Sequence, residues 1–185
     1  MQRFFSPLVR WLTVVLLGAA SATLVGCAGT PGQGADATPA EPRTEFDEPE
    51  NRKRARIRIE LASGYFEQGQ HTVALDEIKQ ALAADPNSAQ AYNLRGLVDM
   101  QMNEAALAEA SFNRALQLNP RDADAMHNLG WMRCQQGRLA PAIEQFARAL
   151  AVPSYANAAR TWMAQGVCQV RAGQNAEAER SFTRA

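Results

Sequence analysis

The sequence is poor in the residues that most often build catalytic centres and cofactor sites. Its 185 residues include three cysteines and two histidines, and three cysteines are too few for a disulfide-stabilised scaffold. His71 and His127 have no spacing to each other or to a cysteine that is typical of a metal site. A phosphate-binding glycine loop, a serine nucleophile elbow and a zinc-protease motif are all missing. We therefore expect no enzyme, no metal, no cofactor and no small-molecule substrate.

Net charge is also missing, because 19 basic side chains balance 19 acidic ones. A neutral chain is not drawn to nucleic acid by bulk electrostatics, so we expect no nucleic-acid partner. The balance hides an asymmetry along the chain. Residues 28–50 carry one arginine and six acids, whereas residues 51–185 carry 16 basic and 13 acidic side chains.

The longest apolar stretch is confined to the N-terminus. Two arginines and then a short uncharged run, WLTVVLLGAASATLVGC, are typical of a secretory signal peptide, here residues 1–26. An uncleaved transmembrane anchor is the alternative, since the 18 uncharged residues from Trp11 to Ala28 just reach spanning length. The ending Leu24-Val25-Gly26-Cys27 resembles the lipobox of bacterial lipoproteins. That resemblance implies cleavage before Cys27, lipid attachment to it and, because Ala28 follows rather than Asp, passage to the outer membrane.

Residues 27–50 are expected to be the lipidated cysteine and a flexible acidic tether. Residues 28–50 contain four prolines and three glycines, and Phe46 is their only large apolar residue. Such a composition buries too little apolar surface to offset the entropy lost on ordering. A docking motif around Phe46 is the alternative.

An internal repeat dominates the remainder, residues 51–185. Small residues recur at Ala62, Gly96, Gly130 and Gly166, and a large apolar residue recurs at Ile78, Phe112, Phe146 and Phe182. The offsets are 34, 34 and 36 residues. A 34-residue period with small residues at fixed positions is the tetratricopeptide repeat (TPR) signature, so we expect an all-α solenoid of antiparallel helix pairs. The expected repeats are about 55–88, 89–122 and 123–156, followed by a truncated fourth at 159–185.

Details inside the repeats give further expectations. Gly69 marks the turn of repeat one, and Met102-Asn103 replaces glycine in repeat two. Asn51 is a candidate N-cap of the first helix, with Ile57 and Leu61 turned inward. The run Arg52, Lys53, Arg54, Arg56 and Arg58 is either a solvated helix face or a contact for lipid headgroups or an acidic partner. No polar capping helix follows repeat four before Ala185, so we expect the protein to continue.

Cys134 and Cys168 occupy neighbouring helices in this repeat scheme. A lipoprotein lies outside the cytoplasm, where disulfides persist. The two residues are therefore either a disulfide that clamps repeat three to repeat four or two buried free thiols. The first possibility requires Cα atoms within about 7 Å.

A TPR solenoid binds extended peptides or helices in the groove lined by its first helices, here called A helices. The side chains expected there lack the Lys–Asn–Arg clamp of chaperone-binding TPRs and are largely apolar, which favours a hydrophobic partner segment. Each of them is either a groove contact or part of the core between repeats. They are Arg56, Ile59, Ser63, Phe66, Asn93, Leu97, Met100, His127, Trp131, Met163, Val167 and Arg171.

The whole pattern resembles the type IV pilus biogenesis lipoproteins of the PilW/PilF family, the pilotins of the pilus secretin. The likeness rests on the lipobox, on Arg54–Ala62 and Gly69–Leu75, on Ala91–Gly96 and His127–Trp131, and on the segments around Cys134 and Cys168. It implies a non-enzymatic adaptor, lipid-anchored on the periplasmic face of the outer membrane, that promotes secretin localisation and multimerisation. A TPR lipoprotein that scaffolds outer-membrane protein assembly or peptidoglycan enzymes is the alternative.

Overall fold

The computed structural model describes residues 48–185, which form eight α-helices with their connections and two short ends. The expected signal peptide, Cys27 and all but the last few residues of the expected tether lie outside this range. The helices are α1 (Glu50–Glu67), α2 (His71–Ala84), α3 (Ala89–Gln101), α4 (Ala105–Leu118), α5 (Ala123–Gln135), α6 (Leu139–Leu150), α7 (Ala158–Arg171) and α8 (Asn175–Thr183). Within the described range, no helix is both long and apolar enough to cross a membrane.

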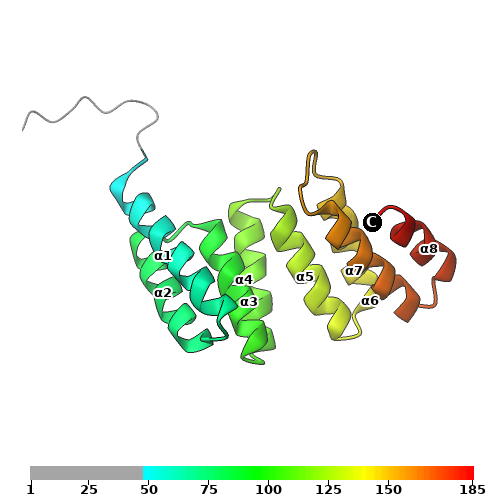
Figure 1. The fold of residues 1–185 in the computed structure, drawn as a ribbon, viewed down its shortest axis with the longest axis horizontal. Helices are drawn as coiled ribbons and strands as arrows, with labels where there is room; N and C mark the ends of the chain where they lie inside the picture. The colour runs from blue at the N-terminus through cyan, green and yellow to red at the C-terminus, as the bar shows by residue number, and fades with distance from the viewer. Residues whose placement is uncertain (1–47) are drawn as a thin grey trace, which may run out of the picture. The chain divides into compact units, whose positions relative to one another are not determined.

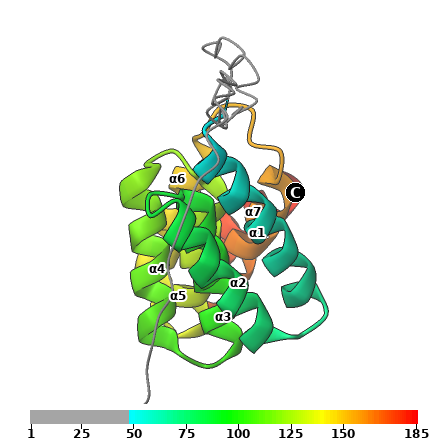
Figure 2. The same cartoon turned by 90° about the vertical axis from the view of Figure 1, so that its left-hand side faces the viewer.

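The helices form four consecutive hairpins that stack in chain order (Figure 1). The odd-numbered helices are the A helices of the four repeats, and the even-numbered helices are their B helices. Each A helix contacts the next A helix, whereas no B helix of residues 48–185 contacts the next B helix. Because closer spacing marks the inside of a curve, the A helices line the concave face. Figure 2 looks along the array and shows the hairpins one behind the other. The expected all-α TPR solenoid is confirmed.

The turn inside each hairpin needs a left-handed residue. Gly69, Gly137 and Gly173 adopt φ of 73°, 77° and 75°, and Asn103 takes the same role at 63°. Asparagine tolerates this region better than most side chains. The Met102-Asn103 exception therefore keeps the same turn geometry as the three glycines.

Two of the three connections between repeats end in a side-chain cap. The side chains of Ser88 and Asp122 accept hydrogen bonds from the backbone N–H groups of Ala91 and Ala125, which starts α3 and α5. The first helix differs from the expectation. Its N-cap is Pro49, with no side-chain capping bond, and Asn51 instead donates to the Ala84 carbonyl oxygen across the hairpin.

Each hairpin of repeats two to four is closed by an aromatic ring lying on a glycine. A Cβ atom built at Gly96 would come within 2.5 Å of Phe112 Cε1, and one at Gly130 within 2.9 Å of Phe146 Cε1. Phe112 and Phe146 are fully buried. The small residues are thus needed because a ring from the B helix occupies the space of their side chains.

The expectation that Ile57 and Leu61 point inward is wrong. Both are 45% exposed, and Ala55, Ile59 and Ala62 form the buried face of α1. The repeat alignment explains the difference. Ile57 is equivalent to Ala91, which is fully buried next to the preceding repeat, but no repeat precedes α1 within the described residues.

Candidate partner-binding cleft

A cleft of about 580 Å³ opens among the A helices. Phe66 of α1 and Leu97 of α3 are its apolar residues, and the rest of the lining is polar or charged. Because the lining comes from four helices, the cleft exists only where consecutive repeats stack. The polar residues are Gln90, Asn93, Asp122, Asp124, Asn128, Asn157 and Arg160.

Two asparagines from neighbouring repeats meet in the cleft. The Asn128 side-chain amide donates to the Asn93 Oδ1 atom over 3.0 Å, which joins α5 to α3. This bond leaves the Asn93 amide N–H groups and the Asn128 carbonyl oxygen without another side-chain partner among residues 48–185. An amide provides both donors and acceptors, so this pair can bond the backbone of an extended segment.

The far end of the cleft is organised by Asp124. Its Oδ1 atom accepts hydrogen bonds from the Tyr155 hydroxyl and the Asn157 amide, each at 3.0 Å, and lies 3.7 Å from Arg160 Nη2. Through these contacts α5 holds the 151–157 connection and the start of α7. Neighbouring Asp122 caps α5, and burial raises the pKa of its carboxyl group. The two carboxyl groups place acidic chemistry at this end.

His127 does not belong to the groove surface, because it is 94% buried with a fractional exposure of only 6%. Its Nδ1 atom lies 2.8 Å from Thr161 Oγ1, and its ring lies 5.6 Å from that of Phe146. Burial, and secondly the charge of Arg160, lower the pKa of His127 to about 4. The residue is therefore a neutral link between α5 and α7 at neutral pH. Ile59, 2% exposed, is likewise core rather than groove.

Other residues expected in the groove are not part of the cleft lining. Met100 and Trp131 pack partly buried against the core, and Met163 and Val167 on α7 are 50% and 38% exposed. Arg56 forms ion pairs with Glu48 and Glu60. Of the residues expected in the groove, only Phe66, Asn93 and Leu97 line the cleft. Its lining is also more polar than the apolar groove expected from the sequence.

The cleft residues that the repeat alignment missed lie mostly at repeat boundaries. Asp122 and Asn157 precede helices, where Asp and Asn are typical caps, and Asp124 and Arg160 follow in the first turns. Their polar identity was visible in the sequence. The repeat spacing also held a signal for three of the missed residues, because Gln90, Asp124 and Arg160 follow Arg56, a residue expected in the groove, at offsets of 34, 34 and 36 residues.

Cys134 and Cys168 are joined as a disulfide in this structure, with Cα atoms 5.9 Å apart and both side chains fully buried. Arg171 Nη1 donates to the Cys134 carbonyl oxygen over 2.7 Å at the same joint. The geometry thus fits the bridged alternative, and whether the bond forms in the protein stays a prediction.

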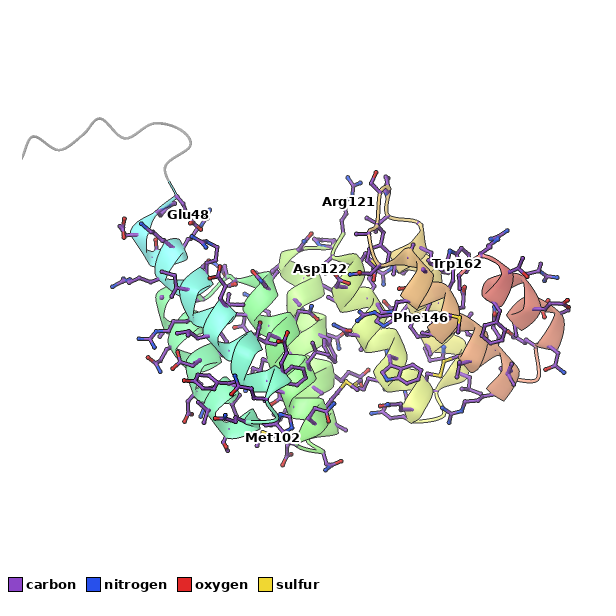
Figure 3. All side chains as sticks on the ribbon, in the orientation of Figure 1. Glu48, Met102, Arg121, Asp122, Phe146 and Trp162 are labelled. Atoms are coloured by element: carbon purple, nitrogen blue, oxygen red, sulfur yellow. A yellow bond between two sulfur atoms is a disulfide. The ribbon has the colours of Figure 1, made fainter. Side chains whose placement is uncertain are left out.

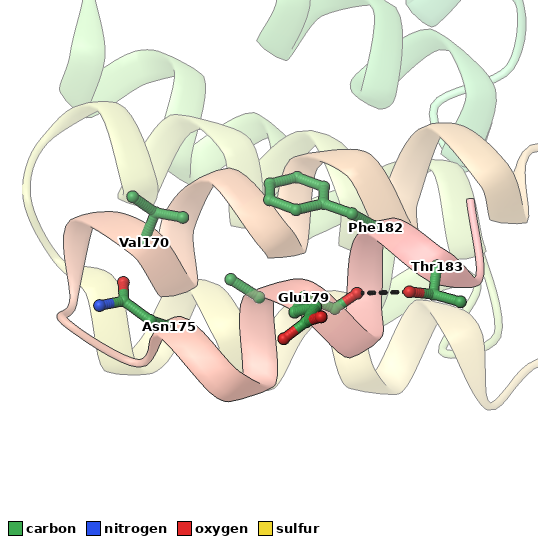
Figure 4. Close-up of a pocket in the computed structure, with 6 residues that line it drawn as sticks. Val170, Asn175, Glu179, Phe182 and Thr183 are labelled. Carbon is green, nitrogen blue, oxygen red and sulfur yellow. Dashed lines mark hydrogen bonds between the residues drawn. The ribbon is translucent and has the colours of Figure 1, made fainter.

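A second hollow, of about 450 Å³, lies on the outer side of the last hairpin (Figure 4). Val170 and Phe182 are its large apolar residues, beside Asn175, Glu179 and Thr183. Phe182 is 38% exposed here, while the equivalent Phe112 and Phe146 are covered by the repeat that follows them. The concave cleft, which several repeats build together, is the stronger candidate for partner binding.

Residues 48–185 contain no group of three or more His, Cys, Asp or Glu side chains placed to hold a metal ion.

Two family profiles described as tetratricopeptide repeat match the chain, one over residues 87–153 and the other over residues 59–101 and 135–185. The chain is 27% identical over 124 residues to the type IV pilus assembly protein PilF of Pseudomonas aeruginosa, which covers 67% of this chain and 49% of that protein.

Solved structures agree with this relationship. The Pseudomonas aeruginosa PilF structure superposes with a TM-score of 0.71 at 25% identity, covering 72% of this chain and 60% of that one. PilW, described as a widely conserved type IV pilus biogenesis factor, gives 0.68 at 29% identity over 70% of this chain and 60% of its own. This chain spans about half to three fifths of the length of these relatives. The chain belongs to the tetratricopeptide repeat family, and the type IV pilus biogenesis proteins PilF and PilW are its homologues.

Proposed function

We propose that this protein is an outer-membrane-anchored, non-enzymatic adaptor of type IV pilus biogenesis that promotes localisation and multimerisation of secretin subunits. The similarity to PilF and PilW in sequence and fold is the observation that supports this most directly. Tetratricopeptide arrays are protein-interaction scaffolds, and their concave faces bind extended partner segments.

The cleft provides a specific way to bind such a segment. The Asn93 amide N–H groups and the Asn128 carbonyl oxygen bond the partner backbone, and Phe66 and Leu97 contact an apolar side chain. The carboxyl groups of Asp122 and Asp124 favour a lysine or arginine in the same segment. The bound segment is therefore mixed apolar and basic, rather than wholly hydrophobic.

A lipid on Cys27 would hold the adaptor at the periplasmic face of the outer membrane. The support is the lipobox-like sequence Leu24–Cys27 followed by Ala28, and each buried methylene of an acyl chain contributes about 0.8 kcal/mol to retention. Intact mass measurement of the protein from its membrane fraction tests this. An acyl mass that disappears in the Cys27→Ser variant is expected, and an unmodified chain that retains residues 1–26 would contradict it.

Affinity capture from cells that assemble pili tests the function itself. The full chain is expected to recover secretin, and the double variant Asn93→Ala, Asn128→Ala is expected to recover at least tenfold less, because each lost backbone hydrogen bond costs about 1 kcal/mol. The double variant Asn113→Ala, Gln117→Ala is the control, since both residues are exposed on α4, outside the cleft. Recovery of barrel-assembly or peptidoglycan factors without secretin would overturn the proposal in favour of the scaffold alternative.

A further inference from the structure

The charged side chains of the repeat domain are segregated toward opposite ends of the helices. Each helix is divided at its midpoint, and each connection is counted with the two helix ends that it links. One half comprises the beginnings of the A helices, the ends of the B helices and the connections between repeats, and we name it the cationic edge. Its residues are 48–58, 78–94, 112–128, 145–164 and 180–185. The other half, the anionic edge, comprises residues 59–77, 96–111, 130–144 and 165–178; the central residues 95, 129 and 179 belong to neither edge.

The two edges carry opposite net charges. The cationic edge holds 12 arginines and lysines against five acids, and the anionic edge holds three arginines against nine acids. Glu48, where the described chain begins, and Arg121 lie at the first edge in Figure 3, and Met102 lies at the other. A domain of nearly balanced charge is therefore strongly polarised along the direction of its helices.

Helix dipoles do not account for this separation. Each edge contains the positive ends of one set of helices and the negative ends of the other, so the backbone contributions are mixed. Arg52, Lys53 and Arg54 even oppose the dipole, because they stand in the first turns of α1. The polarity comes from side chains: six of the 12 cations lie in repeat one, and the other six are spread over repeats two to four.

Much of the positive charge is not neutralised by neighbours. Some cations of this edge form ion pairs, for example Arg56 with Glu48, Arg58 with Glu77 and Lys79 with Asp76. Seven other cations of the cationic edge have no ion pair within residues 48–185, and most are exposed. These are Arg52, Lys53, Arg54, Arg114, Arg121, Arg148 and Arg184. A merely solvated surface would mix both signs rather than collect unpaired cations on one edge.

We propose that the cationic edge lies on the anionic phospholipid headgroups of the membrane to which the protein is anchored. This orientation rests on the proposed lipid at Cys27. The 20 residues between Cys27 and Glu48 let the two ends lie at most about 75 Å apart, which is long enough for any side of the domain to face the bilayer. The anchor alone therefore sets no orientation, whereas attraction of the cationic edge and repulsion of the anionic edge do.

The orientation has a consequence for the cleft. The helices run from one edge to the other, so a membrane beneath the cationic edge leaves the concave face at right angles to the lipid surface. A partner segment then enters the cleft from the side. A flat anionic partner suits cations that are distributed along the edge from α1 to α8, each of which contributes about fivefold to binding near an anionic surface.

Energy transfer on vesicles tests the orientation in the full lipidated protein. A donor is placed at Gln117→Cys on the cationic edge or at Gln136→Cys on the anionic edge, both exposed positions, and acceptors label the headgroups. Cys134 and Cys168 are fully buried and do not compete for the label. With phosphatidylglycerol in the vesicles, transfer from Gln117 is expected to exceed that from Gln136. The difference should vanish on pure phosphatidylcholine or when salt rises from about 0.1 M to 1 M, because the Debye length falls from about 10 Å to 3 Å.

Two matched variants assign the effect to the edge rather than to net charge. Arg52→Gln, Lys53→Gln, Arg54→Gln removes three positive charges from the cationic edge. Gln68→Glu, Gln101→Glu, Gln174→Glu adds three negative charges at exposed positions of the anionic edge. The first variant is expected to lower the ratio of docked to undocked protein about 100-fold, at about fivefold per cation. The second is expected to leave the docked state in place.

The outcomes separate this inference from the function on which it rests. Retention on phosphatidylcholine vesicles reports the lipid anchor, and the difference between the two donors reports the edge. Equal transfer from both donors on anionic vesicles would overturn the inference while leaving anchoring and secretin capture intact. A second result would also overturn the inference. If the protein binds polyglutamate saturably and shows no preference for anionic vesicles, the edge binds an acidic protein rather than lipid.

Discussion

The Phe112 ring lies over Gly96 so closely that a methyl group on Gly96 would stand 2.5 Å from its Cε1 atom. The same contact recurs between Gly130 and Phe146 and between Gly166 and Phe182. The three contacts differ in how freely the ring can move. Phe112 and Phe146 are fully buried, whereas Phe182 is 38% exposed.

Substitution of these glycines is expected to give graded losses of stability. Gly96→Ala should lower the free energy of unfolding by about 1–3 kcal/mol, because a buried ring must shift. Gly166→Ala should cost less, because Phe182 can swing outward. The bulkier Gly130→Leu is expected to exceed both by wedging the hairpin apart. Urea unfolding of the variants measures the order.

Gly64→Ala is the control for this series. A Cβ atom at Gly64 meets nothing within 4 Å, so the exchange should be neutral or stabilise the helix by up to about 1 kcal/mol. If Gly96→Ala unfolds like Gly64→Ala, the ring contact is not what selects glycine at this position.

The Cys134–Cys168 bridge is expected to stabilise the joint between repeats three and four. A loop of 34 residues between bridged cysteines corresponds to about 4 kcal/mol from restriction of the unfolded chain. Thermal unfolding with and without reductant measures the effect, and Cys134→Ala with Cys168→Ala serves as the comparison. Two reactive thiols in the unfolded, unreduced protein, besides any at Cys27, would show that the bridge is not formed.

Acid is expected to weaken the protein partly through His127. Its pKa is about 4 in the folded protein and 6.5 ordinarily, so the unfolded chain binds the proton more readily. The stability that His127 provides is therefore fully present above pH 6.5 and is lost as pH falls from 6.5 toward 4. The loss is about 3 kcal/mol.

Comparison with His127→Gln isolates this contribution. Denaturant unfolding of both proteins at pH 7 and pH 4.5 should show a steeper loss in the parent chain. Asp99 and Asp122, whose pKa values burial raises, titrate in both proteins and cancel in the difference. Equal slopes would mean that the imidazole is solvated in the folded state.

Thr161 is expected to be the most sensitive hydroxyl of the domain. It is fully buried between His127 and Tyr155, at 2.8 and 3.2 Å. Thr161→Val keeps the shape but leaves the buried His127 Nδ1 atom without its partner, at a cost of about 1–3 kcal/mol, while Tyr155 keeps its bond to Asp124. Thr183→Val, which removes an exposed hydroxyl bonded to the Glu179 carbonyl oxygen, should change thermal stability very little. Similar losses in the two variants would argue against the buried network.

The sequence predicted local and periodic features of the fold better than contacts between side chains of neighbouring repeats. The recurring Gly–Phe spacing and the turn residues Gly69 and Asn103 are local or periodic features, so the solenoid and its helix pairs followed from them. Ile57 was misplaced because its burial depends on a neighbouring repeat rather than on its own helix. Phe66, Asn93 and Leu97 were found at groove positions. Asp124 and Arg160 occupy equivalent positions of repeats three and four, and they were missed because their 3.7 Å contact arises only when α5 and α7 stack.

The hydrogen bonds between repeats are separate from the contacts that hold each repeat together. Each ring-on-glycine contact is made within one hairpin. The bonds from Asn128 to Asn93, from His127 to Thr161 and from Arg171 to the Cys134 carbonyl oxygen all join one repeat to the next. Substitutions at these joints can therefore change the curvature of the concave face while every hairpin remains folded. The shape of the binding face can therefore change to fit a different partner segment while the fold of each repeat stays the same.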